Sequence, residues 1–291
     1  MKDLKQITVI GLGLLGGSIA LAVSRIWPMV QITGYTHRTS TRRKARRLLT
    51  AARIVDDIKE SVSDADLVIV AAPISSFEEI FRTIGGVLRR GCIVTDVGST
   101  KVQPHQWAAK YLPKGVHYAG SHPIAGSEQR GVEFARDDLF EKALCILTKT
   151  KNTSNEAVQI LKRFWSSLGC CVKLMKPAEH DKVFASISHL PHITAAALIN
   201  ASNTSELKFA GKGFIDTSRV ASGPANIWAD VLATNAQNSV KGINKIIAEL
   251  EKLKIAIRSK DKKKIKRLLE AARNKRAAFI KYKIKSEEII P

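Results

Sequence analysis

A glycine-rich turn near the start of the chain constrains the fold more than any other feature of the sequence. The turn has the sequence Gly11-Leu12-Gly13-Leu14-Leu15-Gly16. The apolar run 7–10 before it predicts a buried strand, and residues 18–23 after it predict a helix. A strand, Gly-x-Gly-x-x-Gly and a helix in this order are typical of a dinucleotide-binding turn. The alternative is a glycine turn that only joins a strand to a helix.

Each glycine would have its own role in such a turn. Gly11 would permit the tight turn, Gly13 would let a pyrophosphate approach the backbone, and Gly16 would let helix and strand pack closely. The N-terminus of the helix would offer unpaired N–H groups and a partial positive charge to the phosphates. We therefore expect a cofactor to contact Gly11, Gly13, Leu14, Leu15 and Gly16.

Apolar strand patterns alternate with helical patterns as far as about residue 176. This alternation predicts an α/β fold, a Rossmann-type domain whose parallel sheet is covered by helices on both faces. The further predicted strands are 31–35, 66–73, 92–96, 144–147 and 171–174, and the further predicted helices are 41–52, 77–88 and 155–168.

The strand pattern stops at Pro177, and the rest of the chain is predicted to be helical. The predicted helices are 179–202, 228–257 and 261–284, with an irregular connection at 203–222. A length of 291 residues suits two domains. We therefore divide the chain into a dinucleotide-binding domain, 1–176, and an all-helical domain, 177–291.

The formal net charge of +21 raises the question of a nucleic-acid partner. Much of the excess lies in residues 260–285, where apolar residues recur at helical spacing, so an amphipathic helix with a solvated basic face explains it. We expect no nucleic-acid partner, although a non-enzymatic protein that senses nucleotides or binds nucleic acid is an alternative. A positive protein also suits a small anionic substrate.

Simple features of the sequence disfavour a membrane protein, a secreted protein and a metal-binding protein. No run approaches the ~18 apolar residues of a membrane span, and the N-terminus lacks the pattern of a signal peptide. The four cysteines lack the spacing of metal ligands, so we expect no metal site. We expect reduced thiols and a cytoplasmic location, with no membrane partner.

The end of the second predicted strand bears on the choice of cofactor. An acid usually lies about 20 residues beyond the glycines, where it binds the ribose 2′-OH of NAD. Here the segment is Thr36-His37-Arg38-Thr39, without an acid. Thr36 and Arg38, with help from Arg42 or Arg43, would suit a 2′-phosphate. The sequence therefore favours NADP as the cofactor, with NAD as the alternative.

Three further segments combine polar residues with loops or helix starts. Residues 96–101 follow a predicted strand, where α/β sheets place their ligands. Residues 120–128 form a predicted glycine-bounded turn that contains His122, and residues 188–192 contain His189 and His192. A single histidine is more often structural than catalytic. Together with the glycine turn, these segments predict a site that handles protons and binds anions.

The sequence resembles the prephenate/arogenate dehydrogenase family of tyrosine biosynthesis over about residues 5–285. The resemblance rests on a series of motifs that occur in the family's order. These motifs are residues 11–18, Asp-Val-Gly-Ser-Thr-Lys at 96–101, His-Pro-Ile-Ala-Gly-Ser-Glu at 122–128, Ser-His-Leu-Pro-His at 188–192, and Gly213-Phe214 through Arg219 to Trp228.

The resemblance implies an NAD(P)-dependent oxidoreductase that decarboxylates a cyclohexadienol acid as it oxidises it. It assigns His122 as the acceptor of the hydrogen bond from the C4 hydroxyl, and Ser99 as a partner of that hydroxyl or of the imidazole. Arg219 would bind a substrate carboxylate, His192 would add a further contact, and Glu128 would order the pocket mouth. The all-helical domain would contact substrate and form a homodimer.

Several alternatives remain open at this level. Prephenate would give 4-hydroxyphenylpyruvate and arogenate would give tyrosine, and the sequence does not separate the two substrates. A 3-hydroxyisobutyrate-like or 6-phosphogluconate-like dehydrogenase would need a catalytic Lys in the helical domain, and the two histidine motifs argue against it. Ser222-Gly223-Pro224 stands where the resemblance leads us to expect Asp-Pro, a departure that would loosen a helix N-cap.

Overall fold

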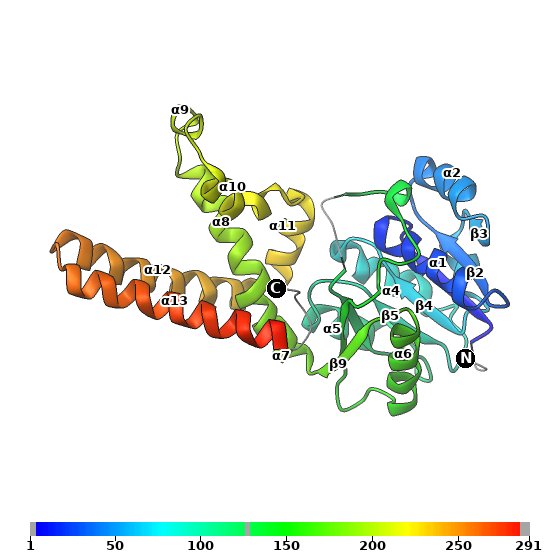
Figure 1. Ribbon diagram of the computed structural model, residues 1–291. Helices are drawn as coiled ribbons and strands as arrows, with labels where there is room; N and C mark the ends of the chain where they lie inside the picture. The colour runs from blue at the N-terminus through cyan, green and yellow to red at the C-terminus, as the bar shows by residue number, and fades with distance from the viewer. Residues whose placement is uncertain (1–3, 126–128, 286–291) are drawn as a thin grey trace. The chain divides into compact units, whose positions relative to one another are not determined.

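Figure 1 shows the computed structural model, which describes residues 4–125 and 129–285. The chain forms two compact units, Met1–Ser239 and Val240–Pro291. The first unit contains all of the described strands and the shorter helices, and most of the two long helices that follow lies in the second unit.

The main sheet has six parallel strands in the order β3-β2-β1-β4-β5-β6. Its strands are β1 (Gln6–Ile10), β2 (Gln31–Tyr35), β3 (Ala52–Val55), β4 (Leu67–Val70), β5 (Ile93–Asp96) and β6 (His117–Tyr118). The strand order reverses between β1 and β4, and ligands of open α/β sheets bind at the carboxyl ends of the strands at such a point. This topology confirms the predicted Rossmann-type fold.

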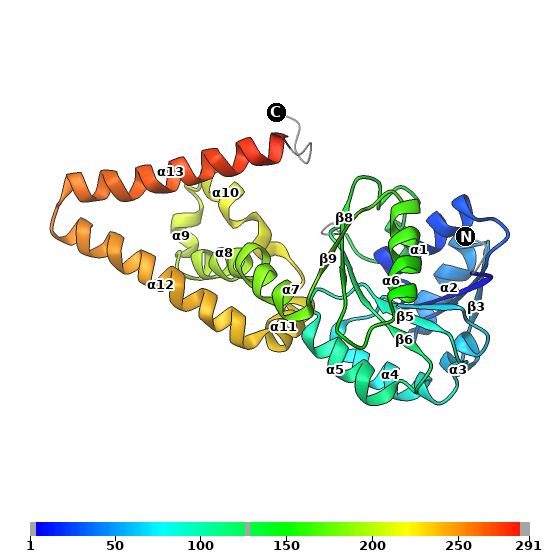
Figure 2. The same cartoon turned by 90° about the horizontal axis from the view of Figure 1, so that it is seen from below.

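Helices cover both faces of the main sheet (Figure 2). One face carries α1 (Leu14–Ile26), α2 (Thr39–Leu48) and α6 (Asn155–Ser167), and the other carries α3 (Ile58–Val62), α4 (Phe77–Gly85) and α5 (Val102–Tyr111). Each face has its own apolar core. Ile7, Ile19 and Trp165 are buried in the first core, and Val68 and Phe77 in the second. Burial on both faces explains the continuous apolar runs of these strands.

A second sheet has three strands, β7 (Gly120–Pro123), β8 (Leu144–Thr148) and β9 (Cys171–Met175), in that order. The sequence predicted a turn at 120–128, whereas the structure has β7 antiparallel to β8, with His122 opposite Ile146. Gly120 and Pro123 suggested a turn, but both residues are compatible with this strand. A Cβ on Gly120 would lie 2.7 Å from Thr148 Oγ1, and a proline is tolerated on an edge strand such as β7.

The first unit ends in a series of helices. They are α7 (Pro177–Phe184), a π-helical turn at Ala185–His189, α8 (Leu190–Asn200), α9 (Thr204–Leu207), α10 (Lys212–Ser218), the 3-10 turn Arg219–Ser222, and α11 (Ala225–Thr234). Short 3-10 turns also occur at Ile74–Ser76 and Val132–Phe134.

The predicted irregular connection at 203–222 was wrong, because that segment contains α9 and α10. The side chain of Asn203 caps α9, and the Glu206 carboxylate returns to the Asn203 N–H at 2.9 Å, forming a capping box. The predicted single helix 228–257 is also interrupted, at Asn235, whose side chain is buried.

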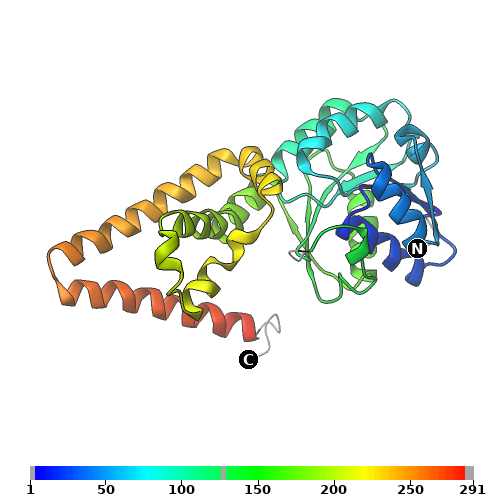
Figure 3. The same ribbon diagram turned by 90° about the horizontal axis from the view of Figure 1, so that it is seen from above.

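Helices α12 (Ala236–Arg258) and α13 (Lys262–Lys285) run in opposite directions from a tight turn (Figure 3). Lys260 has a left-handed conformation (φ 53°) just after α12, and Asp261 Oδ1 accepts a hydrogen bond from the Lys264 N–H at 2.9 Å to cap α13. Within the described residues, every helix is too short or too polar to cross a membrane.

Candidate active site

The three glycines of the first turn differ in what surrounds them. Gly11 has φ +99°, a backbone conformation that favours glycine, and a Cβ on Gly16 would lie 1.8 Å from the Gly11 carbonyl oxygen. Gly13 has ordinary dihedral angles, and a Cβ there would have no heavy atom within 4 Å. The fold itself therefore requires the first and third glycines. The second leaves open space at the N-cap of α1, next to the N–H groups of Leu14 and Leu15.

A cavity of about 440 Å³ lies at the carboxyl ends of β1, β2 and β4. Gly11, Thr36, Pro73 and Glu79 are among its lining residues. The cavity and the open space at Gly13 both occur at the point where the strand order reverses, so this part of the structure fits a dinucleotide. The acid that lines it, Glu79, comes from α4 and pairs with Arg82 at 2.5 Å.

The cations predicted beside Thr36 have different roles in the structure. Arg42 donates to the Thr36 carbonyl at 2.7 Å and to the His37 carbonyl at 3.1 Å, and it forms an ion pair with Asp56 at 2.7 Å. Its guanidinium therefore stabilises the loop that contains Thr36 and His37. Arg38 is exposed at the N-cap of α2, beside the buried Thr36.

His122 lies in β7 and forms a hydrogen-bonded chain with α7. Its Nδ1 lies 2.8 Å from His180 Nε2, and His180 Nδ1 lies 2.8 Å from Asp181 Oδ1. Phe184 packs against both rings, with centroids 4.7 Å from His122 and 4.4 Å from His180. Burial, with smaller contributions from His180 and Lys101, holds the pKa of His122 well below 6.5, so its imidazole is neutral near pH 7.

Asp181 is fixed at the N-terminus of α5. Its Oδ1 accepts from the Lys101 N–H at 2.7 Å and its Oδ2 accepts from the Val102 N–H at 2.9 Å. On its other side, Asn235 Nδ2 donates to the Asp181 carbonyl oxygen at 2.7 Å. The N-terminus of α5 therefore holds the carboxylate of Asp181 next to His180, Asn235 holds its backbone, and the carboxylate caps the helix that follows the 96–101 segment.

The 96–101 segment contains a fully buried ion pair between Lys101 and Asp96. Lys101 Nζ also donates to the Ser121 carbonyl at 2.6 Å, and Tyr118 Oη donates to Asp96 Oδ2 at 2.6 Å. Separating a buried pair is costly because each charge would be left without a partner. Lys101 therefore ties the end of β5 to β7 and is not available to a substrate. Ser99 lies half-buried in the same loop.

A second cluster surrounds His192. Its ring stacks on Trp228, with centroids 3.7 Å apart and planes 8° apart, and its Nδ1 lies 2.9 Å from the Val220 carbonyl oxygen. This contact places His192 beside the turn that begins at the exposed Arg219. Burial lowers the pKa of His192.

His189 lies between the two clusters. It is buried, its Nδ1 lies 3.3 Å from Asn235 Nδ2, and its ring is 6.2 Å from that of Trp228. Burial lowers its pKa to about 4. The structure therefore divides Ser-His-Leu-Pro-His into a structural His189 and a candidate site residue, His192. Glu128 lies outside the described residues.

Sequence reasoning missed His180, Asp181 and Asn235. The first two were included in the predicted helix 179–202, and the signal that could have found them is an adjacent His–Asp pair in the first turns of that helix. Asn235 gave no signal, because its role depends on a break between α11 and α12 that brings its side chain to Asp181.

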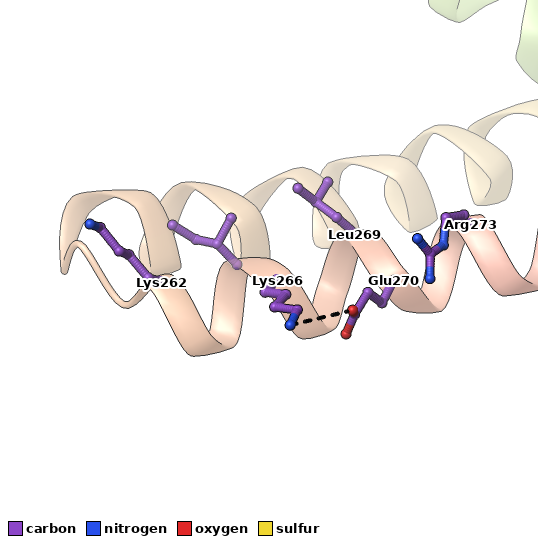
Figure 4. Close-up of a pocket in the computed structure, with 6 residues that line it drawn as sticks. Lys262, Lys266, Leu269, Glu270 and Arg273 are labelled. Carbon is purple, nitrogen blue, oxygen red and sulfur yellow. Dashed lines mark ion pairs between the residues drawn. The ribbon is translucent and has the colours of Figure 1, made fainter.

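Another hollow, of about 390 Å³, lies along α13 (Figure 4). Its lining residues all come from this one helix, among them Lys262, Leu269 and Arg273, and Lys266 pairs with Glu270 at 3.8 Å. An active site needs a proton acceptor that is fixed by contacts with another helix or strand. The lining of this hollow comes from α13 alone and offers none, so the hollow is not a candidate active site.

Comparison with known proteins gives matches over most of the chain. The model of the nucleotide-binding domain of prephenate dehydrogenase matches residues 19–174, and that of its dimerization domain matches residues 176–271. A cyclohexadienyl dehydrogenase of Zymomonas mobilis is 32% identical over 268 residues, which are 90% of this chain and 91% of the relative. A prephenate dehydrogenase of Bacillus subtilis is 33% identical over 283 residues, 95% of this chain and 76% of the relative.

A solved structure is similar over the same extent. The crystal structure of prephenate dehydrogenase from A. aeolicus, in complex with hydroxyphenyl propionate and NAD⁺, has a TM-score of 0.87 and 31% sequence identity. The match covers 94% of this chain and 98% of that one.

Proposed function

The chain belongs to the prephenate dehydrogenase family, and we propose that it converts prephenate to 4-hydroxyphenylpyruvate in tyrosine biosynthesis. The observation that supports this most is the environment of His122. Its ring is neutral, it is held through Nδ1, and it lies on the strand β7 that Lys101 ties to the end of β5. A neutral, oriented imidazole suits the acceptance of a hydroxyl proton.

The enzyme is an NAD(P)-dependent oxidoreductase, and the first unit contains the residues that would hold the cofactor. The N–H groups of Leu14 and Leu15 would meet the pyrophosphate across the open space at Gly13, and Gly11 and Gly16 would shape the turn. A bound NAD(P)⁺ would supply the acceptor for the hydride of C4 of the substrate ring.

For the 2′ position of the ribose we propose a preference for NADP. Thr36 lies at the cavity and Arg38 is exposed next to it, so a guanidinium can approach a 2′-phosphate there. Arg42 would support this site indirectly, since it holds the carbonyls of Thr36 and His37 in place.

His122 would handle the proton of the C4 hydroxyl. It would accept the hydroxyl proton as C4 is oxidised to a carbonyl, and the proton would return to that oxygen when the bond to the ring carboxylate breaks and the ring becomes aromatic. CO₂ leaves with this second step. Ser99 would hydrogen-bond the same hydroxyl or the imidazole, which would fix the orientation of the two groups.

The remaining assignments concern the anionic substrate. Arg219 would bind a carboxylate through its forked guanidinium, and His192 would contact the substrate from its stack on Trp228. Glu128 would order the pocket mouth. The homodimer, the cytoplasmic location and the boundary near residue 176 also stay predictions.

The direct test is reduction of NADP and NAD, measured side by side with prephenate and with arogenate. We expect the highest kcat/KM with prephenate and NADP. A higher kcat/KM with arogenate would assign the enzyme to the alternative substrate. A preference for NAD by about tenfold, which is about 1.4 kcal/mol, would refute the proposed role of Thr36 and Arg38.

A further inference from the structure

The hydrogen bonds around His180 have a direction that the structure determines. The N–H groups of Lys101 and Val102 can only donate, so both side-chain oxygens of Asp181 act as acceptors. Its Oδ1 also faces His180 Nδ1 at 2.8 Å, so this nitrogen must carry a proton. A neutral His180 then has its lone pair on Nε2.

The same direction continues to His122. Since His180 Nε2 is an acceptor, the 2.8 Å contact requires a proton on His122 Nδ1. The lone pair of His122 is then on Nε2. The other ring nitrogen decides the tautomer of a histidine in this way. Burial lowers the pKa of His180, which keeps it neutral near pH 7 although Asp181 acts in the opposite direction.

We infer that His180, anchored by Asp181, is a positioning residue that fixes the Nδ1-protonated tautomer of His122 and leaves Nε2 as the acceptor for the substrate hydroxyl. The kinetic part of this inference rests on the proposed function, whereas the tautomer itself does not. In the opposite tautomer, Nε2 would carry a proton and would be unable to accept one. His180 would then control the rate without touching the substrate.

Three variants separate hydrogen bonding from packing. His180→Phe keeps a ring next to Phe184 but removes the acceptor for His122. His180→Gln can restore it, because its carbonyl oxygen can accept from His122 while its amide donates to Asp181. His105→Gln is the matched control, since His105 is also largely buried but bonds to Thr148 at 3.0 Å.

The first readout is long-range ¹H–¹⁵N NMR of the histidines in the protein without substrate. The chain has seven histidines, and the signals of His122 are assigned by their loss in His122→Asn. We expect His122 to be protonated on Nδ1 in the wild type, in His180→Gln and in His105→Gln. In His180→Phe we expect the proton to move to Nε2. A wild-type His122 protonated on Nε2 would overturn the inference, whatever the activity and however the variants fold.

The second readout is steady-state kinetics with the better substrate and cofactor. We expect kcat of His180→Phe to fall at least about tenfold with KM and cofactor affinity nearly unchanged, and His180→Gln to recover most of the loss. A Gln variant as slow as the Phe variant, or a Phe variant with the wild-type kcat, would contradict the inference. Failure of the proposed function alone would give a different pattern. The NMR result would stand, but His122→Asn would keep its activity.

Discussion

Burial lowers the pKa of the histidines in and around the candidate site, and this shift keeps their rings neutral near pH 7. The pKa values of His122, His180, His189 and His192 are all lowered, with burial as the largest cause. Neutral rings can accept protons but cannot neutralise a substrate with two carboxylates. The positive charge must therefore come from a residue that stays protonated, and a guanidinium does so at any physiological pH.

Arg219 is our candidate for this charge. We predict that Arg219→Ala raises KM for prephenate about tenfold to a hundredfold, since a charged hydrogen bond contributes about 1.5–3 kcal/mol. Arg219→Lys would recover part of the loss, because an ammonium lacks the fork geometry. Initial-rate kinetics at saturating cofactor measure the effect. An unchanged KM would remove Arg219 from the substrate site, and Lys101 could not replace it because Asp96 binds it in the core.

At the scale of elements, the turn before α1 separates residues that the fold needs from a residue that the cofactor needs. We predict that Gly13→Ala leaves the melting temperature nearly unchanged but weakens cofactor binding, because the methyl group enters only the open space. Gly16→Ala should destabilise the protein itself, since its Cβ would overlap the Gly11 carbonyl. Thermal melts and a cofactor titration test both. A Gly13→Ala protein with wild-type affinity would show that nothing binds close to this backbone.

The sequence predicted the elements that have strong local signals. Apolar runs covered on both faces identified β1, β2, β4 and β5, and the glycine turn predicted where a cofactor would bind. Short or polar elements were missed: β3 follows α2 after only three residues, and β7 consists of Gly-Ser-His-Pro, whose strand conformation comes from pairing with β8. The His122–His180 contact joins residues 58 positions apart, so only the tertiary fold could reveal it.

At the scale of the whole molecule, the second unit exposes apolar side chains along both of its helices. Leu250, Ile257, Leu269 and Phe279 are each more than half exposed. Extensive exposed apolar surface is typical of an interface. We predict a homodimer, so light scattering should give about twice the 31.9 kDa of the chain. A monomer across micromolar concentrations would contradict this prediction.

Stability should depend on pH through the histidines whose pKa is lowered by burial, among them His105 and His189. Burial lowers the pKa of His105 and of His189 to about 4, whereas the unfolded chain titrates near 6.5. Below pH 6.5 the unfolded state therefore binds more protons, and the free energy of unfolding falls until about pH 4. By pH 5 the loss is about 2 kcal/mol for each histidine.

Urea titrations between pH 7 and pH 5 measure this loss. His105→Gln should reduce the dependence on pH, because one of the contributing groups is removed. A free energy of unfolding that stays constant over this range would contradict the burial of neutral imidazoles.

The kcat of His122→Asn, measured together with the cofactor dissociation constant, shows whether His122 is the proton acceptor. We predict that kcat falls by about 10²- to 10⁴-fold, the usual contribution of a general base, while cofactor affinity stays within about twofold. His105→Gln, a control outside the site, should keep the wild-type kcat. A His122→Asn enzyme that retains most of its kcat would rule out His122 as the proton acceptor.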